Sequence, residues 1–239
     1  MVLPFKLSVV EDSNKAERAL AKAVVDQVLK KKESLIGLAT GQTMIGVYKI
    51  LVEEEKKNIG LFADTVFVQL DEIVPKAETD RLFSKELQEI FLNRLEGGYH
   101  SFLSIDILAQ SLTDEASRHC LSIKRLGGID LQILGIGVNG HIGYNEPGSD
   151  LNSTCRIVKL ADETIKRSEY QTNTMGITLG IADILAAEKI VLLATGSSKA
   201  KAIEKTLRLP VSSDNPASHI INHKAVEIIL DQNAAGSIT

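Results

Sequence analysis

The sequence predicts an α/β fold in which helices cover both faces of a mainly parallel β-sheet, giving three layers. Strand-like and helix-like segments alternate along the whole 239-residue chain, and such alternation is typical of parallel sheets. Several strand candidates are nearly continuous runs of Val, Ile and Leu, as expected for strands covered on both faces. No Pro/Ser-rich linker or low-complexity tract interrupts the pattern, so we expect a single domain over residues 1–239.

The N-terminal part of the chain alternates strand, helix and strand. Lys6–Val10 is the first predicted strand, and Ser13 is in position to act as the N-cap of the helix that follows. Apolar residues then recur at the spacing of one helical face. That face consists of Ala16, Leu20, Val24 and Val28. The apolar run Leu35–Ala39 is predicted as the second strand.

The rest of the chain repeats this alternation. Thr65–Leu70 is the third predicted strand. Two helices are predicted after it, because apolar residues recur there at helical spacing. Their buried faces are Phe83, Leu87, Ile90 and Phe91, and then Ala116, Cys120 and Ile123. Three more apolar runs are predicted as strands, at Leu131–Leu134, Lys189–Ala194 and Ala225–Leu230.

The composition narrows the classes of function. Hydrophobic residues make up 44% and charged residues 24%, which is ordinary for a globular protein, and a net charge of −4 argues against a nucleic-acid partner. No apolar run approaches the roughly 20 residues of a membrane span, and the N-terminus lacks a signal-peptide pattern. Cys120 and Cys155 show no metal-ligand spacing and are interpreted as reduced thiols. We therefore expect a cytoplasmic protein without a membrane partner.

The loop after Leu131–Leu134 carries the densest set of chemical groups. Asn139, His141 and Glu146 follow a glycine-rich turn, at the end of a strand where open α/β sheets bind ligands. Histidine suits proton transfer near neutral pH, and the carboxylate five residues on can orient its ring. The histidines at positions 100, 119, 219 and 223 lack such a setting and are interpreted as surface or packing residues.

The same loop formally matches the dinucleotide-binding pattern G-x-G-x-x-G between Gly135 and Gly140. That pattern requires a long helix that starts at its third glycine. Pro147 interrupts the chain within two turns and is unfavourable inside a helix. A nicotinamide cofactor is therefore not expected.

The tetrapeptide Leu-Ala-Thr-Gly occurs twice, at residues 38–41 and 193–196, each time between an apolar run and a helical pattern. A strand followed by Thr-Gly and a helix N-terminus can bind an anion, because free backbone N–H groups and the helix dipole point toward the ligand. Lys199 adds a full charge in the second copy. The alternative is a pair of tight turns with capping hydroxyls, and the two interpretations stand about equal.

Asp71 and Glu72 directly follow the third predicted strand. Paired acids in this position often cap a helix. Alternatively, Asp71 lies in the same crevice as His141, because parallel strands deliver their carboxyl ends to one edge of the sheet. A carboxylate there can act as a general base.

Several segments of the chain resemble motifs of the glucosamine/galactosamine-6-phosphate isomerases, a family also called amino-sugar-6-phosphate deaminases. The specific match is Gly-x-Gly-x-Asn-Gly-His-Ile-Gly-Tyr-Asn-Glu-Pro-Gly at 135–148. Weaker matches fall in the family's order, at residues 38–43, 70–72, 196–200 and 216–218. The similarity extends from about Leu35 to Asp231.

The resemblance implies a modified Rossmann-like fold and a reaction that needs neither metal nor cofactor. The sugar ring opens, a proton moves from C2 to C1, and the imine hydrolyses to a ketohexose 6-phosphate and ammonia. Asp71 would be the base, and His141 would assist ring opening with Asn139 and Glu146 tuning it. The implied binding residues are Thr40, Gly41, Gln42, Thr43, Glu72, Gly137 and Lys199, with Arg167 as the nearest phosphate-binding candidate in the lid.

The resemblance leaves the exact substrate and the assembly open. Ile73 stands where the glucosamine branch usually has Tyr, which favours galactosamine 6-phosphate. A related 6-phosphogluconolactonase is the alternative enzyme, but its loop lacks the equivalent of Glu146. A non-catalytic sugar-phosphate sensor would need a DNA-binding module, for which the length leaves no room. Self-association into a homo-oligomer also stays open.

Overall fold

The computed structural model describes residues 5–76 and 81–238. Its centre is a seven-stranded parallel sheet, which confirms the predicted α/β class. The strands are β1 (Lys6–Val10), β2 (Leu35–Leu38), β3 (Val66–Gln69), β5 (Ser101–Leu103), β6 (Leu131–Leu134), β9 (Lys189–Ala194) and β10 (Val226–Asp231). All six predicted strands are confirmed to within one residue at each end, whereas the short β5 is not predicted by the sequence.

The order of the strands creates the place for a site. Across the sheet they run β1-β10-β9-β6-β2-β3-β5. From β2 the chain builds outward through β3 to β5, and from β6 it builds the other way through β9 to β10. The direction therefore reverses between the neighbours β2 and β6. Open α/β sheets bind ligands in the crevice outside the carboxyl ends of the strands at such a switch point.

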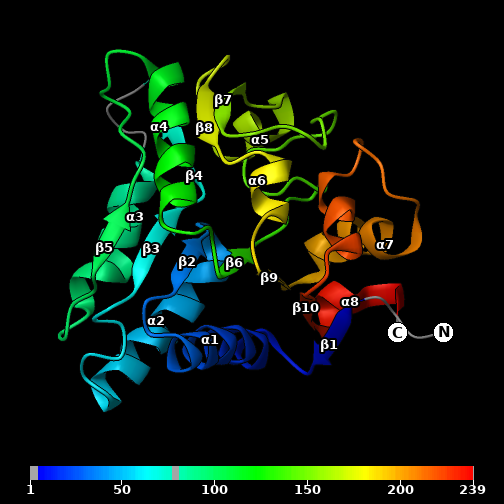
Figure 1. The fold of residues 1–239 in the computed structure, drawn as a ribbon. Coiled ribbons are helices and arrows are strands. Elements are labelled where there is room, and N and C mark those ends of the chain that lie inside the picture. The colour runs from blue at the N-terminus through cyan, green and yellow to red at the C-terminus, as the bar shows by residue number, and fades with distance from the viewer. Residues whose placement is uncertain (1–4, 77–80, 239) are drawn as a thin grey trace.

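Helices cover both faces of the large sheet and form the outer layers (Figure 1). On one face lie α1 (Ser13–Lys30) and α2 (Gln42–Lys57), and on the other lie α6 (Ile181–Leu185) and α7 (Ala200–Arg208). The remaining helices are α3 (Phe83–Ile90), α4 (Leu112–Arg125), α5 (Asp162–Arg167), α8 (Gln232–Ala235) and the 3-10 turns η1 (Leu92–Arg94), η2 (Ser197–Lys199), η3 (Pro216–Asn222) and η4 (Gly236–Ile238). No helix in the described ranges has the length and apolar character to cross a membrane.

The three predicted helical stripes correspond to α1, α3 and α4. The stripe of α1 is buried as predicted. Its predicted cap is wrong by one residue, because the side chain of Asp12 accepts a 2.8 Å hydrogen bond from the backbone N–H of Lys15. Ser13 is instead the first residue of the helix. Asp and Ser are equally good caps, so the sequence alone does not choose between adjacent positions.

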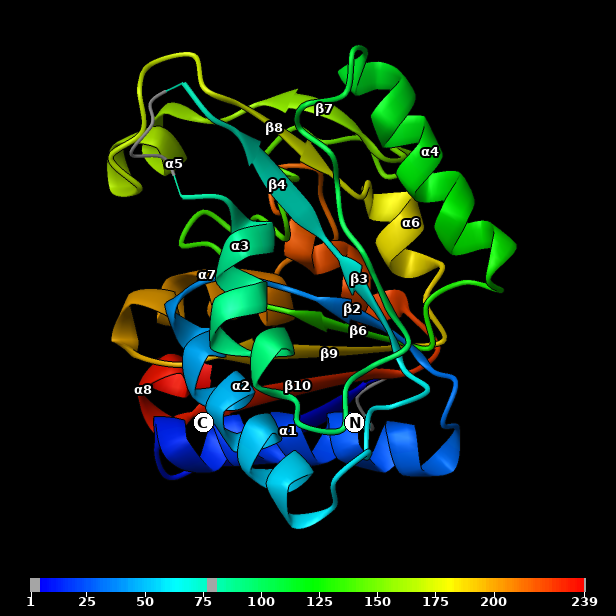
Figure 2. The same cartoon turned by 90° about the vertical axis from the view of Figure 1, so that its left-hand side faces the viewer.

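A second, antiparallel sheet is the part of the fold that the sequence does not predict. It consists of β4 (Asp71–Val74), β8 (Met175–Thr178) and β7 (Arg156–Lys159), in that spatial order. In Figure 2 it lies beyond the β2–β3 side of the large sheet, near α4 and α6. Only Leu70 separates β3 from β4, so the chain leaves one sheet and enters the other at Asp71.

Candidate active site

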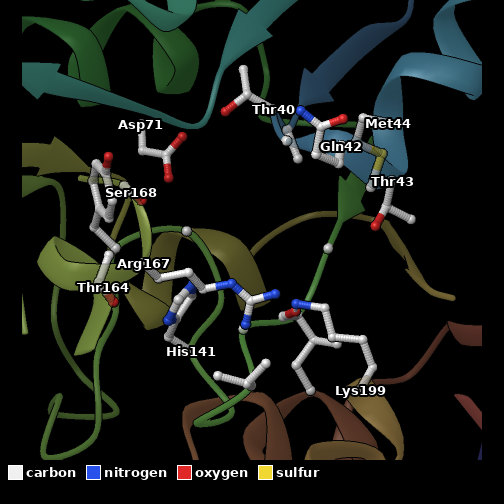
Figure 3. A pocket seen from close by; sticks show the side chains of 18 of the residues that line it. Thr40, Gln42, Thr43, Met44, Asp71, His141, Thr164, Arg167, Ser168 and Lys199 are labelled. Atoms are coloured by element: carbon white, nitrogen blue, oxygen red, sulfur yellow. Dashed lines mark hydrogen bonds between the residues drawn. The ribbon is translucent and has the colours of Figure 1, made fainter. Parts of the chain in front are cut away.

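A pocket of about 730 Å³ opens at the switch point, which is within the usual range for a small-molecule site (Figure 3). It is lined by the segments that follow β2, β3, β6 and β9, together with parts of α3 and α5. Ten of the predicted site residues line it, namely Thr40, Gly41, Gln42, Thr43, Asp71, Gly137, Asn139, His141, Arg167 and Lys199. Glu72 and Glu146 are buried just outside the lining.

Asp71 is a buried acid that faces the pocket from the junction of the two sheets. Burial, and then the negative charge of Glu72, raise the pKa of the Asp71 carboxyl from 3.8 to about 7. About half of such a group is ionised at neutral pH. The position therefore favours a group that takes up and releases a proton near neutrality.

Glu72 points away from the pocket and holds the start of α3. Its carboxylate accepts hydrogen bonds of 2.8 Å from the backbone N–H groups of Phe83 and Ser84. Gln69 donates a further 2.9 Å bond from its side chain. The sequence left helix cap and base as alternatives for this acidic pair. In the structure the Glu72 side chain caps the start of α3, whose N-cap position is Leu82, and Asp71 faces the pocket.

His141 lies in the pocket with its ring against the glycine-rich turn. Its Nδ1 atom is 3.3 Å from Oε2 of Glu146, an ion-pair distance without the alignment of a good hydrogen bond. A Cβ atom at Gly137 would lie 2.4 Å from Nδ1 of the ring. A side chain at this position would displace the imidazole, so the space above Gly137 is what the histidine occupies.

Glu146 is held from several sides. Asn139 donates a 2.8 Å bond to Oε2, and the Thr164 hydroxyl donates a 2.5 Å bond to Oε1. Burial alone would raise the pKa of the Glu146 carboxyl, but the contact and charge of His141 and these two donors outweigh it and lower the pKa to about 2. Glu146 is therefore a permanent negative charge beside the imidazole.

Asn139 links the backbone of His141 to the side chain of Glu146 within the loop. Its side-chain oxygen accepts a 3.2 Å bond from the backbone N–H of His141. No helix begins at Gly140, and the next regular element is β7. The dinucleotide pattern thus lacks the helix it requires.

The opposite end of the pocket combines a helix N-terminus with two basic side chains. α2 begins after Gly41, which has a φ of 111° and leaves the helix N-terminus without a side-chain cap. Figure 3 shows Arg167 and Lys199 extending toward each other near this end. Burial, and then the charge of Arg167, lower the pKa of Lys199 to about 8. Among the described residues neither cation forms an ion pair with a carboxylate.

The two Leu-Ala-Thr-Gly copies are similar in shape but differ in their bonds. Gly41 and Gly196 both have positive φ, at 111° and 84°. The N–H of Gly196, however, donates to both carboxylate oxygens of Asp231 at 3.0 Å. The second copy therefore contributes chiefly by positioning Lys199, whose ammonium group donates a 2.6 Å bond to the carbonyl of Ile136.

A family model described as glucosamine-6-phosphate isomerases/6-phosphogluconolactonase matches residues 11–230. The chain belongs to this family. A family member named glucosamine-6-phosphate deaminase from Staphylococcus saprophyticus is 37% identical over 96% of this chain and 98% of its own length. One of the same name from Rhodopirellula baltica is 36% identical over 96% and 94%. The predicted family resemblance is thus confirmed.

Solved structures of family members have the same fold. A monomeric glucosamine-6-phosphate deaminase superposes with a TM-score of 0.88 at 29% identity, covering 97% of this chain and 99% of that one. A 6-phosphogluconolactonase from Trypanosoma cruzi has a TM-score of 0.81 at 18% identity over 100% and 98%, a level at which only the fold is shared.

Some pocket residues are not predicted by the sequence. They include Met44, Tyr144, Thr164 and Ser168. Thr164 has no sequence signal, because α5 is only six residues long and its contact to Glu146 arises from tertiary structure. The described residues contain no cluster of His, Cys, Asp or Glu suited to a metal ion. His119 and His223 pack in the interior, with Nε2 of each 2.8 Å from a backbone carbonyl, as predicted.

Proposed function

We propose that this chain converts an amino-sugar 6-phosphate to the corresponding ketohexose 6-phosphate and ammonia. The observation that carries the proposal is one pocket with two chemically distinct ends. A carboxyl of raised pKa, Asp71, shares the pocket with the His141–Glu146 pair. Arg167, Lys199 and the uncapped start of α2 form the other end.

The cationic end suits the phosphate group of the substrate. Arg167 and Lys199 have no carboxylate partner in the part of the chain that the structure describes, which favours a dianion, and charge-assisted hydrogen bonds are the strong ones. The N–H groups at the start of α2 add the partial positive charge of a helix N-terminus. A phosphate bound here directs C1 and C2 of the sugar toward the other end of the pocket.

The first chemical step is ring opening. The negative charge of Glu146 beside Nδ1 of His141 favours the tautomer with its proton on Nδ1, which leaves Nε2 free to accept a proton. His141 takes the proton of the anomeric hydroxyl, and a proton is returned to the ring oxygen as the bond between C1 and that oxygen breaks. The product is an open-chain amino aldehyde.

The second step is the transfer between C2 and C1. Asp71 removes the proton from C2 while a proton of the substrate's ammonium group passes to O1, which gives an enolamine, and Asp71 then returns its proton to C1. The resulting imine at C2 then reacts with water to give the ketone and ammonia. A base whose pKa is about 7 is well matched to this exchange at neutral pH.

The C4 configuration of the sugar is the finer part of the proposal. Relatives at 36% and 37% identity are named for glucosamine 6-phosphate, and we take this sugar as the first substrate to test. The preference for galactosamine 6-phosphate stays a prediction. Ile73, on which it partly depends, is fully buried and does not line the pocket.

The lactonase alternative makes a different demand on the pocket. Opening a lactone needs an activated water and no base at C2, so it gives no reason for a buried acid of raised pKa at Asp71. A sensor would not need the His141–Glu146 pair either. Both alternatives predict that Asp71→Asn leaves the main function intact.

The test is an ammonia-release assay on glucosamine 6-phosphate and galactosamine 6-phosphate, run beside a lactonase assay on 6-phosphogluconolactone. We expect ammonia from at least one amino sugar, no lactone hydrolysis above background, and loss of the activity in Asp71→Asn. Lactone hydrolysis without ammonia release would reject the proposal. Ligand binding with neither activity would favour the sensor.

The proposal includes a cytoplasmic protein whose partner is a small sugar phosphate. Cys120 and Cys155 are both free thiols, which reducing compartments maintain. The net charge of −4 gives no support for a nucleic-acid partner. The relative with the TM-score of 0.88 is described as monomeric, and light scattering on the purified protein would decide between a monomer and a homo-oligomer.

A further inference from the structure

Thr164 joins helix α5 to the catalytic carboxylate. Its buried hydroxyl donates a 2.5 Å bond to Oε1 of Glu146. The other oxygen, Oε2, accepts from Asn139 and faces Nδ1 of His141. With one oxygen held by Thr164, the carboxylate group cannot rotate about its last bond without losing a buried hydrogen bond. Thr164 thereby restrains the plane of the carboxylate that faces the imidazole.

The same helix carries a phosphate-binding candidate. Arg167 follows Thr164 by three residues, so the two side chains lie on one face of α5. Both line the pocket. Arg167 faces Lys199, and an anion between them would relieve the repulsion of the two cations. Phosphate bound at this point would hold the C-terminal end of α5.

Few apolar contacts fix α5. The helix spans six residues, from Asp162 to Arg167. Ile165 packs in a small cluster with Tyr144 and Leu160, which is separate from the main core. Segments with few buried apolar contacts are the least stable parts of a fold. The placement of α5 therefore depends strongly on the bond from Thr164, and a contact from Arg167 to a bound anion would add a second polar attachment.

We propose that α5 couples phosphate capture to catalysis, with Thr164 as the positioning residue. Phosphate on Arg167 holds the helix, Thr164 passes this restraint to Glu146, and Glu146 orients His141. Thr164 does not touch the reacting atoms. The catalytic meaning of the coupling rests on the proposed function, but the coupling between a bound anion and the imidazole is a property of binding and can be measured without turnover.

The direct experiment follows the Cε1–H NMR signal of His141 during titration with inorganic phosphate, with the signal assigned by its absence in His141→Asn. In the wild-type protein phosphate should shift this signal. Thr164→Val, which keeps the shape and loses the donor, should bind phosphate with similar affinity but lose the shift. Thr164→Ser, which keeps the donor, should restore most of it. Arg167→Met should abolish the shift even at phosphate concentrations that saturate its weaker site.

Kinetics provides the second readout. One buried hydrogen bond to a charged group corresponds to roughly tenfold in rate, so Thr164→Val should lower kcat about tenfold with little change in KM. Thr164→Ser should recover most of the loss. Equal losses in both variants would mean that Thr164 matters for packing and would overturn the proposal.

The outcomes separate this proposal from the proposed function. A donor-dependent phosphate shift in a protein that releases no ammonia would keep the coupling and reject the deaminase. Normal ammonia release with an unchanged phosphate shift in Thr164→Val would keep the deaminase and reject the coupling. If Thr164→Val does not fold, the other two variants decide. A phosphate-induced shift that persists in phosphate-saturated Arg167→Met rejects the coupling. Loss of the shift in Arg167→Met, together with a retained shift in Thr164→Ser, supports it.

Discussion

Replacing Asp71 with Asn should lower turnover and raise stability at the same time. Asp71→Asn keeps the shape of the side chain and removes its negative charge. Burial and the neighbouring charge of Glu72 raise the pKa of the Asp71 carboxyl from 3.8 to about 7 in the folded protein. The unfolded chain keeps the ordinary pKa. Above this pKa the folded protein contains an ionised Asp71, and it is less stable than it would be with Asp71 protonated.

The size of the effect follows from this pKa difference. Because the folded pKa is the higher one, stability is lost as the pH rises from about 3.8 to about 7, and the loss is complete above that value. A difference of this size corresponds to ~4 kcal/mol. Asp71→Asn should thus raise the free energy of unfolding by up to about 4 kcal/mol at pH 8 and by little at pH 4. Loss of a general base should lower kcat by roughly 10²–10⁴-fold.

Denaturant unfolding at pH 4 and pH 8, together with ammonia release, tests both parts. Glu72→Gln is the matched control, because it neutralises the adjacent acid, whose carboxylate caps α3 and does not line the pocket. It should destabilise the protein by about 1–3 kcal/mol, since the carboxylate accepts bonds from the N–H groups of Phe83 and Ser84. An Asp71→Asn protein that turns over at nearly the wild-type rate, or is less stable at pH 8, would refute the reasoning.

Three further predictions concern other groups of the pocket. Lys199→Ala should raise KM about tenfold or more with little change in kcat, because a charge-assisted phosphate contact is lost. In the unaltered protein Lys199 has a pKa of about 8, so KM measured from pH 6.5 to 9.5 should rise as the ammonium group loses its proton. Glu146→Gln should shift the pH–rate profile, and superimposable profiles would remove Glu146 from the proton chemistry. Gly137→Ala should lower kcat about tenfold or more by displacing the His141 ring, while calorimetry should find phosphate affinity unchanged.

The large sheet could be predicted because its strands are buried on both faces. Such strands read as apolar runs, and Leu131–Leu134 and Lys189–Ala194 match the structure at both ends. The parallel arrangement then brings the segments after β2, β6 and β9 to one edge of the sheet. Eight of the predicted site residues meet there because of this rule, whereas Asp71 comes from β4 and Arg167 from α5.

The small sheet and α5 could not be predicted for physical reasons. β4, β7 and β8 have four residues each, and β4 contains the two acids that suggest a helix cap. None of the three reads as an apolar run, since β7 begins and ends with a basic residue and β8 contains Gly176, whereas the equally short β2, β3 and β6 are largely apolar. The bond between Thr164 and Glu146 joins residues 18 positions apart. It forms only after β7 and α5 have packed, so no local pattern announces it.

The topology also explains why Asp71, the proposed base, comes from outside the large sheet. β2 and β6 are neighbours, which places residues 40–43, the predicted phosphate-binding segment, beside the loop of His141. The proposed reaction needs a third group on the other side of the pocket, and a helix directly after β3 would leave that side open. Instead the chain crosses at Leu70 into an antiparallel strand, where Asp71 is paired with Thr178. The carboxyl is thereby buried, and the burial that raises its pKa is a direct result of the second sheet.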